Sequence, residues 1–518
     1  MTSARKSTPS SGAAPSFDQL LRPKAEDAPF GNIIGGRWIP ARSGRTFENR
    51  NPARPDDLIG RFPESDETDA HAAIEAAKAA FDAWRLTPAP RRGEILFRTG
   101  EILITHKEAM AQAMTREMGK VLAETRGDVQ EAIDMCFYAA GEGRRLYGRT
   151  TPSEMPEKAC MTVRMPLGVC GLITPWNFPM AIPSWKILPA LICGNTVVLK
   201  PASDTPLSSL LLVKALEEAG IPPGVVNVVF GSGRSVGQPI IDHSDVRLVS
   251  FTGSCEVGRL VNERCAPAFK RVSLEMGGKN AVIIMPDANL DLAVEGIVWG
   301  AFGTSGQRCT ATSRIIAHRE IHHALREKLI AKIKSLTLGD GLQDGVGIGP
   351  VVNEAAMKRI LEYIAIGKEE GATLLTGGER DTRAGAGWFV QPTLFDNVKT
   401  GMRIAQEEIF GPVTALIPVA DFDEAVRTAN DSDFGLSTAV YTKDVNLAFR
   451  ALRDLEAGIT YINAPTIGAE VHLPFGGVKQ TGNGHRDAGE TALDVFSEWK
   501  SCFIDYSDRL QRAQIDHD

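Results

Sequence analysis

The sequence predicts an α/β fold built from two sheets of parallel strands with helices packed against them. Short apolar runs alternate with helical stretches from residue 160 onward, and a second alternation of the same kind runs from about 281 to 470. This spacing is typical of right-handed βαβ units. At about 150 residues per domain, the 518 residues suggest roughly three domains. The composition, 43% hydrophobic and 23% charged, is that of a globular protein.

The chain before residue 160 is expected to begin with a tail and to continue as helices. Residues 1–28 are rich in Ser, Ala and Pro, which predicts a disordered tail. A transit peptide is the alternative, although the prolines at 9 and 15 would break the amphipathic helix that such a peptide needs. Residues 66–85 carry apolar side chains at helical spacing, and residues 91–142 continue in the same style without proline.

The first alternation contains five expected strands, each followed by polar or glycine residues. The strands are expected at 169–173, 196–199, 226–229, 247–250 and 271–274, and the helices at 180–193, 206–219, 234–241 and 255–266. Ligands of doubly wound sheets bind beyond the carboxyl ends of the strands. We therefore expect a ligand site at one edge of this sheet, made of Asn177, Lys200, Gly231-Ser-Gly233, Gly253-Ser254 and Glu275.

Charge and cysteine content exclude several classes of partner. The 57 basic and 64 acidic residues give a net charge of −7, so no global electrostatic attraction to nucleic acid is expected. No apolar run approaches the roughly 18–20 residues that cross a bilayer, so no membrane partner is expected. None of the eight cysteines forms a C-x-x-C pair, which argues against a zinc ribbon or a disulfide framework. We expect no metal site and a reducing, cytoplasmic compartment.

Cys309 differs from the other cysteines because it lies in a polar, glycine-rich segment, residues 303–310. Beside Arg308, it is expected to be an exposed thiol with a depressed pKa, which favours a nucleophile. Burial as a small apolar residue is the alternative. Glu275 is a candidate base or else a surface glutamate, and the side-chain amide of Asn177 is a candidate donor to an oxyanion.

Glycine turns at the strand ends suggest a phosphate-bearing ligand. Gly231 and Gly233, with Gly237, form a degenerate dinucleotide fingerprint, for which an ordinary β–α turn is the alternative. Gly253-Ser254 precedes an expected helix and offers N–H groups and a hydroxyl to a phosphate, or simply a helix cap. Lys200 at a strand end suits a ribose or phosphate, whereas a solvated lysine is the default.

Taken together, these motifs resemble the NAD(P)-dependent aldehyde dehydrogenase family over about residues 30–510. The resemblance lies in T-P-W-N-F-P, L-E-M-G-G-K, G-Q-R-C-T, E-E-I-F-G-P-V at 407–413 and P-F-G-G-V-K at 474–479. Glu275 precedes Cys309 by 34 residues and Asn177 precedes it by 132, spacings that match the family.

The resemblance implies three parts to the fold. They are a Rossmann-like dinucleotide-binding domain (29–150 and 167–277), a second α/β catalytic domain (278–480) and a small β oligomerisation arm (151–166 and 490–510). In such an arm, the last strand would lie at about 498–506. Edge-strand pairing through the arm would give a homodimer or a homotetramer.

The resemblance also implies a mechanism. Cys309 would attack the aldehyde, and Asn177 with the Cys309 backbone N–H would stabilise the oxyanion. After hydride passes to the nicotinamide, Glu275 would activate the water that hydrolyses the thioester. Lys186 matches a lysine that often relays protons in the family.

The cofactor implied is NAD or NADP. Lys200 and Ser203 would lie at the adenosine ribose, Ser254 at the pyrophosphate, and Glu408 and Phe410 at the nicotinamide. The remaining cofactor-binding residues expected are Thr174, Pro175, Trp176, Gly233 and Gly253. Ser203 stands where many NAD-selective members have a glutamate that repels a 2′-phosphate, so NADP becomes acceptable. Cys255 replaces the usual threonine after Gly-Ser.

Two sets of residues suggest different substrates. Residues 463–470 and 504–511 resemble the antiquitin group, the α-aminoadipic semialdehyde dehydrogenases, in which residues matching Glu131 and Arg308 would recognise the substrate's far end. A helix-surface ion pair is the alternative for Glu131. The P-W-N-F-P motif and His472-Leu473-Pro474 depart from that group.

The main expectation is therefore an acidic ω-semialdehyde such as α-aminoadipic semialdehyde. The motif P-W-N-F-P is common among succinate and α-ketoglutarate semialdehyde dehydrogenases, which are the alternative. A broad-range aldehyde dehydrogenase is a further alternative, because Arg308 can be structural. A cofactor-independent cysteine hydrolase is the alternative from a different class, and a CoA-acylating aldehyde dehydrogenase is disfavoured by Glu275.

Overall fold

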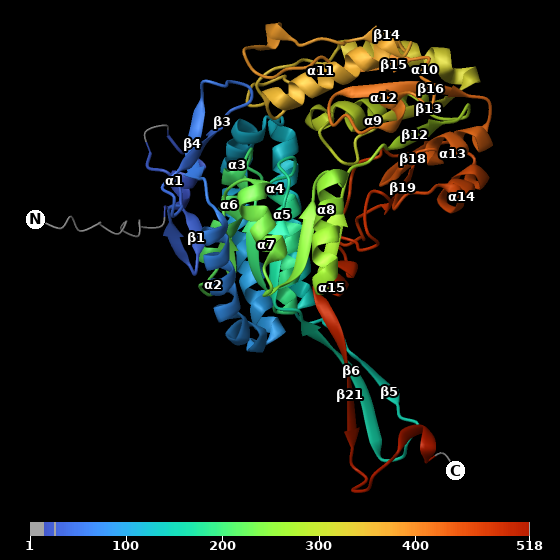
Figure 1. The fold of residues 1–518 in the computed structure, drawn as a ribbon. Helices are drawn as coiled ribbons and strands as arrows, with labels where there is room; N and C mark the ends of the chain where they lie inside the picture. The colour runs from blue at the N-terminus through green and yellow to red at the C-terminus, as the bar shows by residue number, and fades with distance from the viewer. Residues whose placement is uncertain (1–14, 25–26, 517–518) are drawn as a thin grey trace, which may run out of the picture.

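The structure is a computed structural model that describes residues 15–24 and 27–516 (Figure 1). Two seven-stranded sheets form its body, and a three-stranded sheet extends from it. No helix of the described residues is both long and apolar enough to span a membrane.

The first sheet has the strand order β11-β10-β7-β8-β9-β1-β2. Its parallel strands are β7 (Val169–Ile173), β8 (Thr196–Lys200), β9 (Val226–Val228), β10 (Val246–Thr252) and β11 (Arg271–Glu275). Two short strands, β1 (Asn32–Ile34) and β2 (Arg37–Ile39), add antiparallel pairing at one edge. The five strands expected from the apolar runs are therefore confirmed. Parallel strands that are buried on both faces have continuous runs of apolar residues, so their positions can be identified in the sequence.

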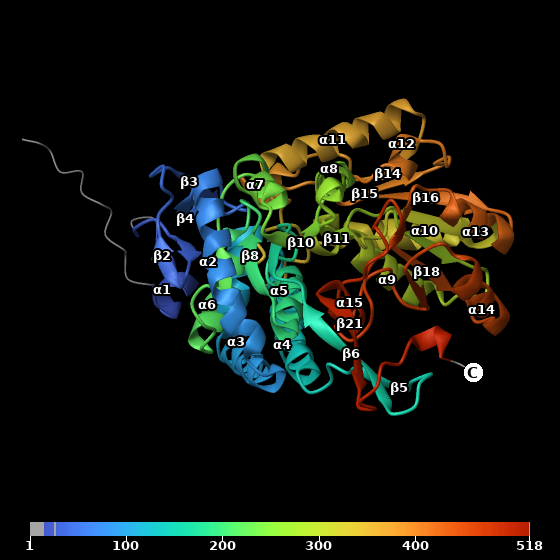
Figure 2. The same cartoon turned by 60° about the horizontal axis from the view of Figure 1, so that its bottom comes forward.

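Helices cover both faces of the first sheet. They are α2 (Glu67–Leu86), α3 (Ala89–Met118), α4 (Leu122–Glu142), α5 (Ala181–Cys193), α6 (Pro206–Glu218), α7 (Gln238–Asp242) and α8 (Cys255–Cys265). A short helical turn, η1 (Gly233–Gly237), leads into α7. Helices α3, α4 and α5 lie side by side in both views (Figures 1 and 2). We call this sheet with its helices the first lobe.

The helical stretch expected at 91–142 is two helices, because the chain breaks at Gly119. Gly119 caps α3 with a φ of 92°, a left-handed conformation that favours glycine. A Cβ on Gly119 would lie 2.7 Å from Pro350 Cγ and 3.0 Å from Pro52 Cγ. The break points the next residues, beginning with Lys120, into the protein interior.

The second sheet, whose existence the second alternation predicts, has the order β14-β15-β16-β13-β12-β18-β19. Its strands are β12 (Ala281–Ile284), β13 (Arg314–His318), β14 (Thr373–Thr376), β15 (Thr393–Asp396), β16 (Val413–Val419), β18 (Ser437–Tyr441) and β19 (Ile459–Ile462). Its helices are α9 (Leu290–Phe302), α10 (Arg319–Lys334), α11 (Glu354–Glu369), α12 (Arg403–Gln406), α13 (Phe422–Asn430) and α14 (Val445–Asp454). We call this part the second lobe.

The extension is an antiparallel sheet of β5 (Arg149–Pro152), β6 (Lys158–Pro166) and β21 (Ser497–Asp505), which we call the arm. Figure 1 shows the arm projecting away from both lobes. The expected arm segment 490–510 begins too early. Helix α15 (Thr491–Val495) packs Leu493 and Val495 into the core of the first lobe, because its side chains there are apolar.

The remaining elements lie near the termini and between the lobes. They are α1 (Phe17–Leu21), a hairpin of β3 (Thr46–Arg50) and β4 (Leu58–Pro63), and the pair β17 (Phe434–Gly435) and β20 (Val478–Lys479). The expected disordered tail, 1–28, falls partly outside the described residues. Within them the expectation is wrong at α1, because Ser16 caps this helix and its apolar side chains are buried in the first-lobe core.

Candidate active site

A cavity of about 420 Å³ lies between the C-terminal edge of the first sheet and the second lobe. The first lobe contributes Phe178 and Glu275, and the second contributes Cys309. Further lining residues include Glu124, Asp128, Glu131, Trp185, Trp299, Arg308 and Asp487. The cavity therefore brings together a thiol, several carboxyl groups, one guanidinium and aromatic walls.

The loop that carries Cys309 follows α9 and has an unusual backbone. Thr304 and Ser305 have φ values of 53° and 55°, in the left-handed region that non-glycine residues rarely adopt. Glu124 of α4 accepts hydrogen bonds from Thr304 N at 2.8 Å and from Arg308 Nη2 at 2.8 Å. Arg308 Nε also donates to Thr304 Oγ1 at 2.9 Å. These contacts fix the loop, and strained loops of this kind cluster at functional sites.

The Cys309 thiol holds its proton more tightly than an ordinary thiol. Burial raises the pKa of Cys309 to about 12, and the nearby carboxyl groups of Glu408 and Glu275 raise it further. The expectation that Arg308 depresses this pKa is therefore wrong. The guanidinium of Arg308 is bound to Glu124 and lies over the rings of Phe178 and Trp299, at 5.5 and 5.9 Å from their centroids.

Glu275 ends β11 and places its carboxyl group in the cavity, buried from bulk solvent. Both carboxyl oxygens lack a hydrogen-bond partner within the described chain. Burial, and next the charge of Asp487, raise the pKa of Glu275 well above its usual range. A carboxyl group with free oxygens and a raised pKa suits proton transfer.

Lys186 of α5 lies close enough to act electrostatically on this carboxyl group and is fully buried. Its Nζ donates to Asp487 Oδ2 at 2.7 Å and to Ser250 Oγ at 2.8 Å. Its charge opposes the rise in the pKa of Glu275. Asp487 and Ser250 were not singled out in the sequence, since neither belongs to a motif that marks chemistry.

Asn177 lies between β7 and α5, and its side chain is buried. Its Nδ2 donates to the carbonyl oxygen of Gln307 at 3.1 Å, which joins it to the Cys309 loop. An amide NH₂ has two hydrogens, so one remains for another acceptor. The structure thus places Asn177 beside the loop that carries Cys309, whereas Glu275 and Cys309 line the cavity itself.

The edge formed by the ends of β8 and β9 offers space and donors to an adenosine end of a dinucleotide. Lys200 Nζ is buried and has one hydrogen-bond partner among the described residues, the Pro201 carbonyl at 2.7 Å, and burial lowers the pKa of Lys200 to about 8. Ser203 is exposed, with Oγ 3.4 Å from the Gly231 carbonyl. A Cβ on Gly233 would meet nothing within 4 Å. An incompletely satisfied buried ammonium beside open space fits a ribose or a phosphate.

The ends of β7 and β10 continue this edge. Thr174 Oγ1 is buried without a partner in the described structure, and Pro175 follows it half-buried. Gly253 leads to Ser254, the exposed N-cap of α8, whose Oγ accepts from Val257 N at 3.4 Å. This exposed helix N-terminus fits a pyrophosphate.

The two residues expected at the nicotinamide, Glu408 and Phe410, each contact a segment that follows a strand of the first sheet. The rings of Trp176 and Phe410 meet edge to face, with centroids 5.4 Å apart. Glu408 Oε1 accepts from Gly278 N at 3.1 Å, and burial raises the pKa of Glu408 to about 7. A Cβ on Gly277 would lie 2.2 Å from Glu408 Oε2, so only glycine permits this approach.

Cys255, which stands in place of the threonine usual in the family, has a hydrogen-bond partner within the protein. Its Sγ donates to the Gln480 carbonyl at 3.3 Å, and burial raises the pKa of Cys255. All eight cysteines are free. Nothing in this contact explains why cysteine rather than threonine stands there.

One face of α4 forms part of the cavity wall. Glu124, Asp128 and Glu131 lie one helical turn apart and all line the cavity. Glu131 makes no hydrogen bond or ion pair with another described residue, so the helix-surface ion pair is wrong. Burial, then the charge of Asp128, raise the pKa of Glu131 to about 8. Glu124, Asp128 and Lys120 were missed in the sequence, where they look like ordinary helix residues.

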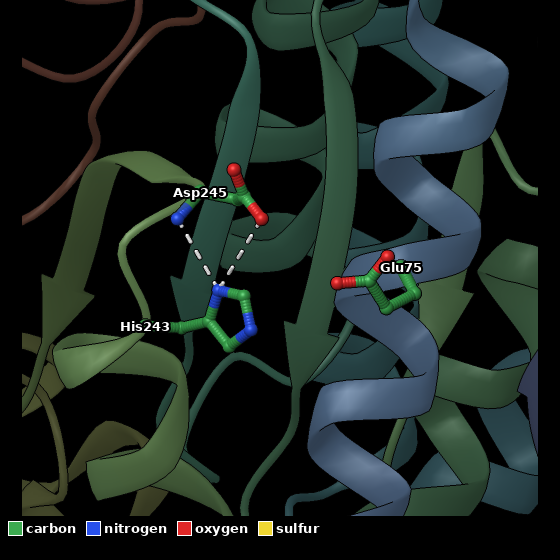
Figure 3. A group of neighbouring side chains, drawn as sticks. All are labelled: Glu75, His243 and Asp245. Carbon is green, nitrogen blue, oxygen red and sulfur yellow. Dashed lines mark hydrogen bonds and ion pairs between the residues drawn. The ribbon is translucent and has the colours of Figure 1, made fainter.

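One group of side chains in the described structure has the spacing of a metal site, away from the cavity. The ligand atoms of Glu75, His243 and Asp245 lie within 4.8 Å of one another (Figure 3). His243 Nδ1 accepts from Asp245 N at 3.2 Å, and the Asp245 carboxylate pairs with Lys78 Nζ at 3.0 Å. The charge of Asp245 is thus balanced within the protein.

Comparison with known proteins shows similarity to aldehyde dehydrogenases. A family model described as the aldehyde dehydrogenase family matches residues 38–502. The chain is 43% identical to an α-ketoglutaric semialdehyde dehydrogenase of Bacillus subtilis, over 91% of this chain and 97% of that protein. It is 43% identical to an α-ketoglutarate semialdehyde dehydrogenase of Haloferax volcanii, over 92% and 99%. It is 40% identical to an NADP⁺ succinate-semialdehyde dehydrogenase of Escherichia coli, over 90% and 96%.

Solved structures agree with the sequence matches. An NADP-dependent enzyme of E. coli superposes with a TM-score of 0.89 at 38% identity, covering 92% of this chain and 98% of that one. An NAD-dependent aldehyde dehydrogenase of Sinorhizobium meliloti superposes with a TM-score of 0.92 at 36% identity, covering 96% and 98%. The fold therefore has counterparts whose names include either nicotinamide cofactor.

Proposed function

Because the chain belongs to the aldehyde dehydrogenase family, we propose that it oxidises an acidic ω-semialdehyde of the α-ketoglutarate semialdehyde kind, with Cys309 as nucleophile. The chain is an NAD(P)-dependent aldehyde dehydrogenase. The observation that carries the proposal is one cavity that holds the Cys309 thiol, the unpartnered Glu275 carboxyl group and the Arg308 cation. Family membership also excludes the alternative function, a cofactor-independent cysteine hydrolase.

The reaction begins at the Cys309 thiol. Its sulfur forms a bond to the aldehyde carbon as the thiol proton leaves to solvent, which the partly exposed Cys309 can reach. The free Asn177 N–H and the Cys309 backbone N–H donate to the oxyanion. When bound, NAD or NADP accepts the hydride that leaves this carbon. A thioester then remains on Cys309.

Glu275 completes the turnover. Its carboxylate takes a proton from water, which attacks the thioester carbon. The C–S bond breaks, so the carboxylic acid leaves and the Cys309 thiol is restored. Lys186 and Asp487 act on the negative charge of Glu275 in opposite directions. The lysine stabilises this charge, whereas the aspartate destabilises it. We propose that Lys186 also serves the proton exchange of Glu275.

The cofactor would be held by this chain's first-sheet edge and by the second lobe. Lys200 and Ser203 would face the adenosine ribose, and the α8 N-terminus at Gly253 and Ser254 the pyrophosphate, with Gly233 leaving room beside it. Glu408 and Phe410 would hold the nicotinamide end, and Thr174, Pro175 and Trp176 would also contact the cofactor.

Replacing Ser203 with glutamate is expected to turn the enzyme toward NAD. The new carboxylate would repel a 2′-phosphate and accept hydrogen bonds from ribose hydroxyls. We expect kcat/KM with NADP to fall at least about tenfold, which is about 1.4 kcal/mol, while kcat/KM with NAD stays within about threefold. Ser203→Gln is the neutral control of similar size. An equal fall for both cofactors would contradict this role for Ser203.

The substrate's acidic end is proposed to lie near Arg308 and Glu131. The sequence favoured α-aminoadipic semialdehyde, but the relatives support the alternative, since two at 43% identity are named for α-ketoglutarate semialdehyde. The protonation state of Glu131 also favours α-ketoglutarate semialdehyde over α-aminoadipic semialdehyde. A pKa of about 8 leaves Glu131 largely protonated at neutral pH, so it can donate a hydrogen bond to a keto or carboxylate oxygen. A neutral carboxyl group is poorly suited to an ammonium group.

Kinetics with a panel of aldehydes test this substrate class. In Arg308→Met, KM for α-ketoglutarate semialdehyde is expected to rise about tenfold or more, because a charge-assisted hydrogen bond is worth about 1.5–3 kcal/mol. KM for an unsubstituted aldehyde of equal length should change little. Arg126→Met, which removes an exposed ion pair between Arg126 of α4 and Glu108, is the control. Equal changes for both aldehydes, or a wild type that prefers the unsubstituted one, would exclude an acid-recognising role.

We further propose that the enzyme is a homodimer or homotetramer that works in the cytoplasm. The arm supports assembly: its strand β21 exposes Trp499, Phe503 and Ile504 away from the body. Eight free cysteines support a reducing compartment. The two sheets support a dinucleotide-binding domain at 29–150 and 167–277 and a catalytic domain at 278–480, since each sheet falls within one of these ranges.

A further inference from the structure

The segment that carries Asn177, residues 174–181, is irregular and is anchored by residues far away in the sequence. Asp128 Oδ1 of α4 accepts from Ala181 N, the first residue of α5, at 2.8 Å. Asp128 Oδ2 accepts from Lys120 Nζ, also at 2.8 Å. The Lys120 Nζ in turn lies 3.5 Å from the centroid of the Phe178 ring. Phe178 follows Asn177 directly. The Lys120–Asp128 ion pair therefore contacts the segment at two places, the Phe178 ring and the last residue, Ala181.

The Phe178 ring is also contacted from the nucleophile loop. Arg308 lies 5.5 Å from the ring centroid, and its neighbour Gln307 accepts the hydrogen bond of Asn177 Nδ2 at 3.1 Å. The ring therefore interacts with two cations, one fixed to α4 through Asp128 and one fixed to the Cys309 loop. Cations over aromatic faces attract, and more strongly away from water. The arrangement sets the position of Asn177 relative to the loop that carries the nucleophile.

Stability alone is a weak reason for such an ion pair. The side chains of Lys120 and Asp128 are both completely buried. Removing two charges from water is costly, and apolar residues of similar volume often replace a buried ion pair without loss of stability. What apolar residues cannot supply is a directed acceptor for Ala181 N together with a charge above the Phe178 ring.

We propose that Lys120 and Asp128 are positioning residues that hold Asn177 where its free N–H meets the oxyanion formed at Cys309. This inference rests on the proposed function, in which Asn177 stabilises that oxyanion. Neither residue touches the reacting atoms. Asp128 acts through the backbone at Ala181, and Lys120 acts through the Phe178 ring.

The test is the double variant Lys120→Met with Asp128→Asn. Methionine fills the space of the lysine, and asparagine keeps an acceptor for Ala181 N, so no unpaired charge is left buried. The single-turnover rate constant for NAD(P)H formation at saturating aldehyde is expected to fall about tenfold, because small misplacements of a donor slow the chemical step. KM for the aldehyde should stay within about threefold, because Arg308 and Glu131 remain and the two removed charges act on the pKa of Glu131 in opposite directions.

A matched control removes an ion pair that lies outside the cavity. Arg116 and Asp57 pair at 2.6 Å and line no part of the site. Arg116→Met with Asp57→Asn is expected to leave the single-turnover rate unchanged. Phe178→Leu provides a second route: it keeps the Lys120–Asp128 pair but removes the ring, and it should reproduce the tenfold loss even where the double variant folds poorly.

A double-mutant cycle with Asn177→Ala decides the proposal. If the pair acts through Asn177, its removal should slow the Asn177→Ala enzyme by less than about twofold. The same tenfold loss in both backgrounds, or no loss in the wild-type background, would overturn the positioning role. Asn177→Ala alone should cost about 10²–10³-fold, as for other oxyanion donors. Full activity of that single variant would instead refute the oxyanion role in the proposed function.

Discussion

Cys309→Ala is expected to abolish NAD(P)H formation from the aldehyde, with a loss of at least about 10⁴-fold in kcat, the scale on which removing a nucleophile acts. Without the sulfur no thiohemiacetal forms, and hydride has no activated carbon to leave. Cofactor affinity should be unchanged, because none of the cofactor contacts proposed involves the thiol. The measurements are absorbance of the reduced cofactor during turnover and calorimetric titration of the variant with NAD or NADP.

Cys502→Ala is the matched control for this result. Cys502 is a free, partly exposed cysteine on the arm, in strand β21, and takes no part in the cavity. Its replacement should leave kcat intact. Retained oxidation in Cys309→Ala would remove the nucleophile from the mechanism, and an equal loss in Cys502→Ala would show that the effect is not specific to Cys309.

Glu275→Gln is expected to form one equivalent of NAD(P)H rapidly and then stall. Acylation of Cys309 can still proceed, but no carboxylate remains to activate the hydrolytic water. General-base catalysis typically contributes about 10²–10⁴-fold, so steady-state kcat should fall by about that much. Stopped-flow absorbance separates the burst from the steady state. A variant that turns over at the wild-type rate without a burst would exclude Glu275 as the base.

The pH dependence of the wild type follows from the same group. A base must be unprotonated to accept a proton, and burial and Asp487 raise the pKa of Glu275 well above its usual range. Steady-state turnover should therefore rise with pH as Glu275 ionises, and the rise should lie above the usual range of a glutamate. Glu275→Gln should lose this rise. An unchanged pH profile in the variant would assign the rise to another group.

The strands and their polar ends could be read from the sequence because parallel buried strands leave continuous apolar runs. Asn177, Lys200 and Glu275 each follow such a run, and the parallel register brings their strand ends to one edge. The end of α3 could not be placed, since Gly119 looks like any helix glycine. Its role depends on Pro52 and Pro350, which are distant in the sequence.

Local sequence failed most clearly at Arg308. An arginine next to a cysteine suggests a depressed thiol pKa, but that holds only if the cation faces the sulfur. Here Glu124, 184 residues earlier, binds the guanidinium and also holds the Thr304 backbone. Lys120 and Asp128 were invisible for the same reason: their roles arise where α4 meets the start of α5. Short-range patterns cannot report such tertiary pairs.

The substrate was the least predictable part. Glu131 and Arg308 suggested a charged pair for an amino-acid end, whereas the structure gives Glu131 a raised pKa and Arg308 a partner in Glu124. Burial of a carboxyl group is a tertiary property that spacing does not reveal. The local P-W-N-F-P motif pointed toward the α-ketoglutarate and succinate semialdehyde group, as the relatives do.

The most direct test of covalent catalysis at Cys309 with hydrolysis by Glu275 is the intact mass of Glu275→Gln after its burst. With α-ketoglutarate semialdehyde and cofactor, we expect one added acyl group per chain, located on the peptide that contains Cys309. Hydroxylamine, which cleaves thioesters, should remove it. An unmodified protein after the burst, or an adduct on any other residue, would contradict the account.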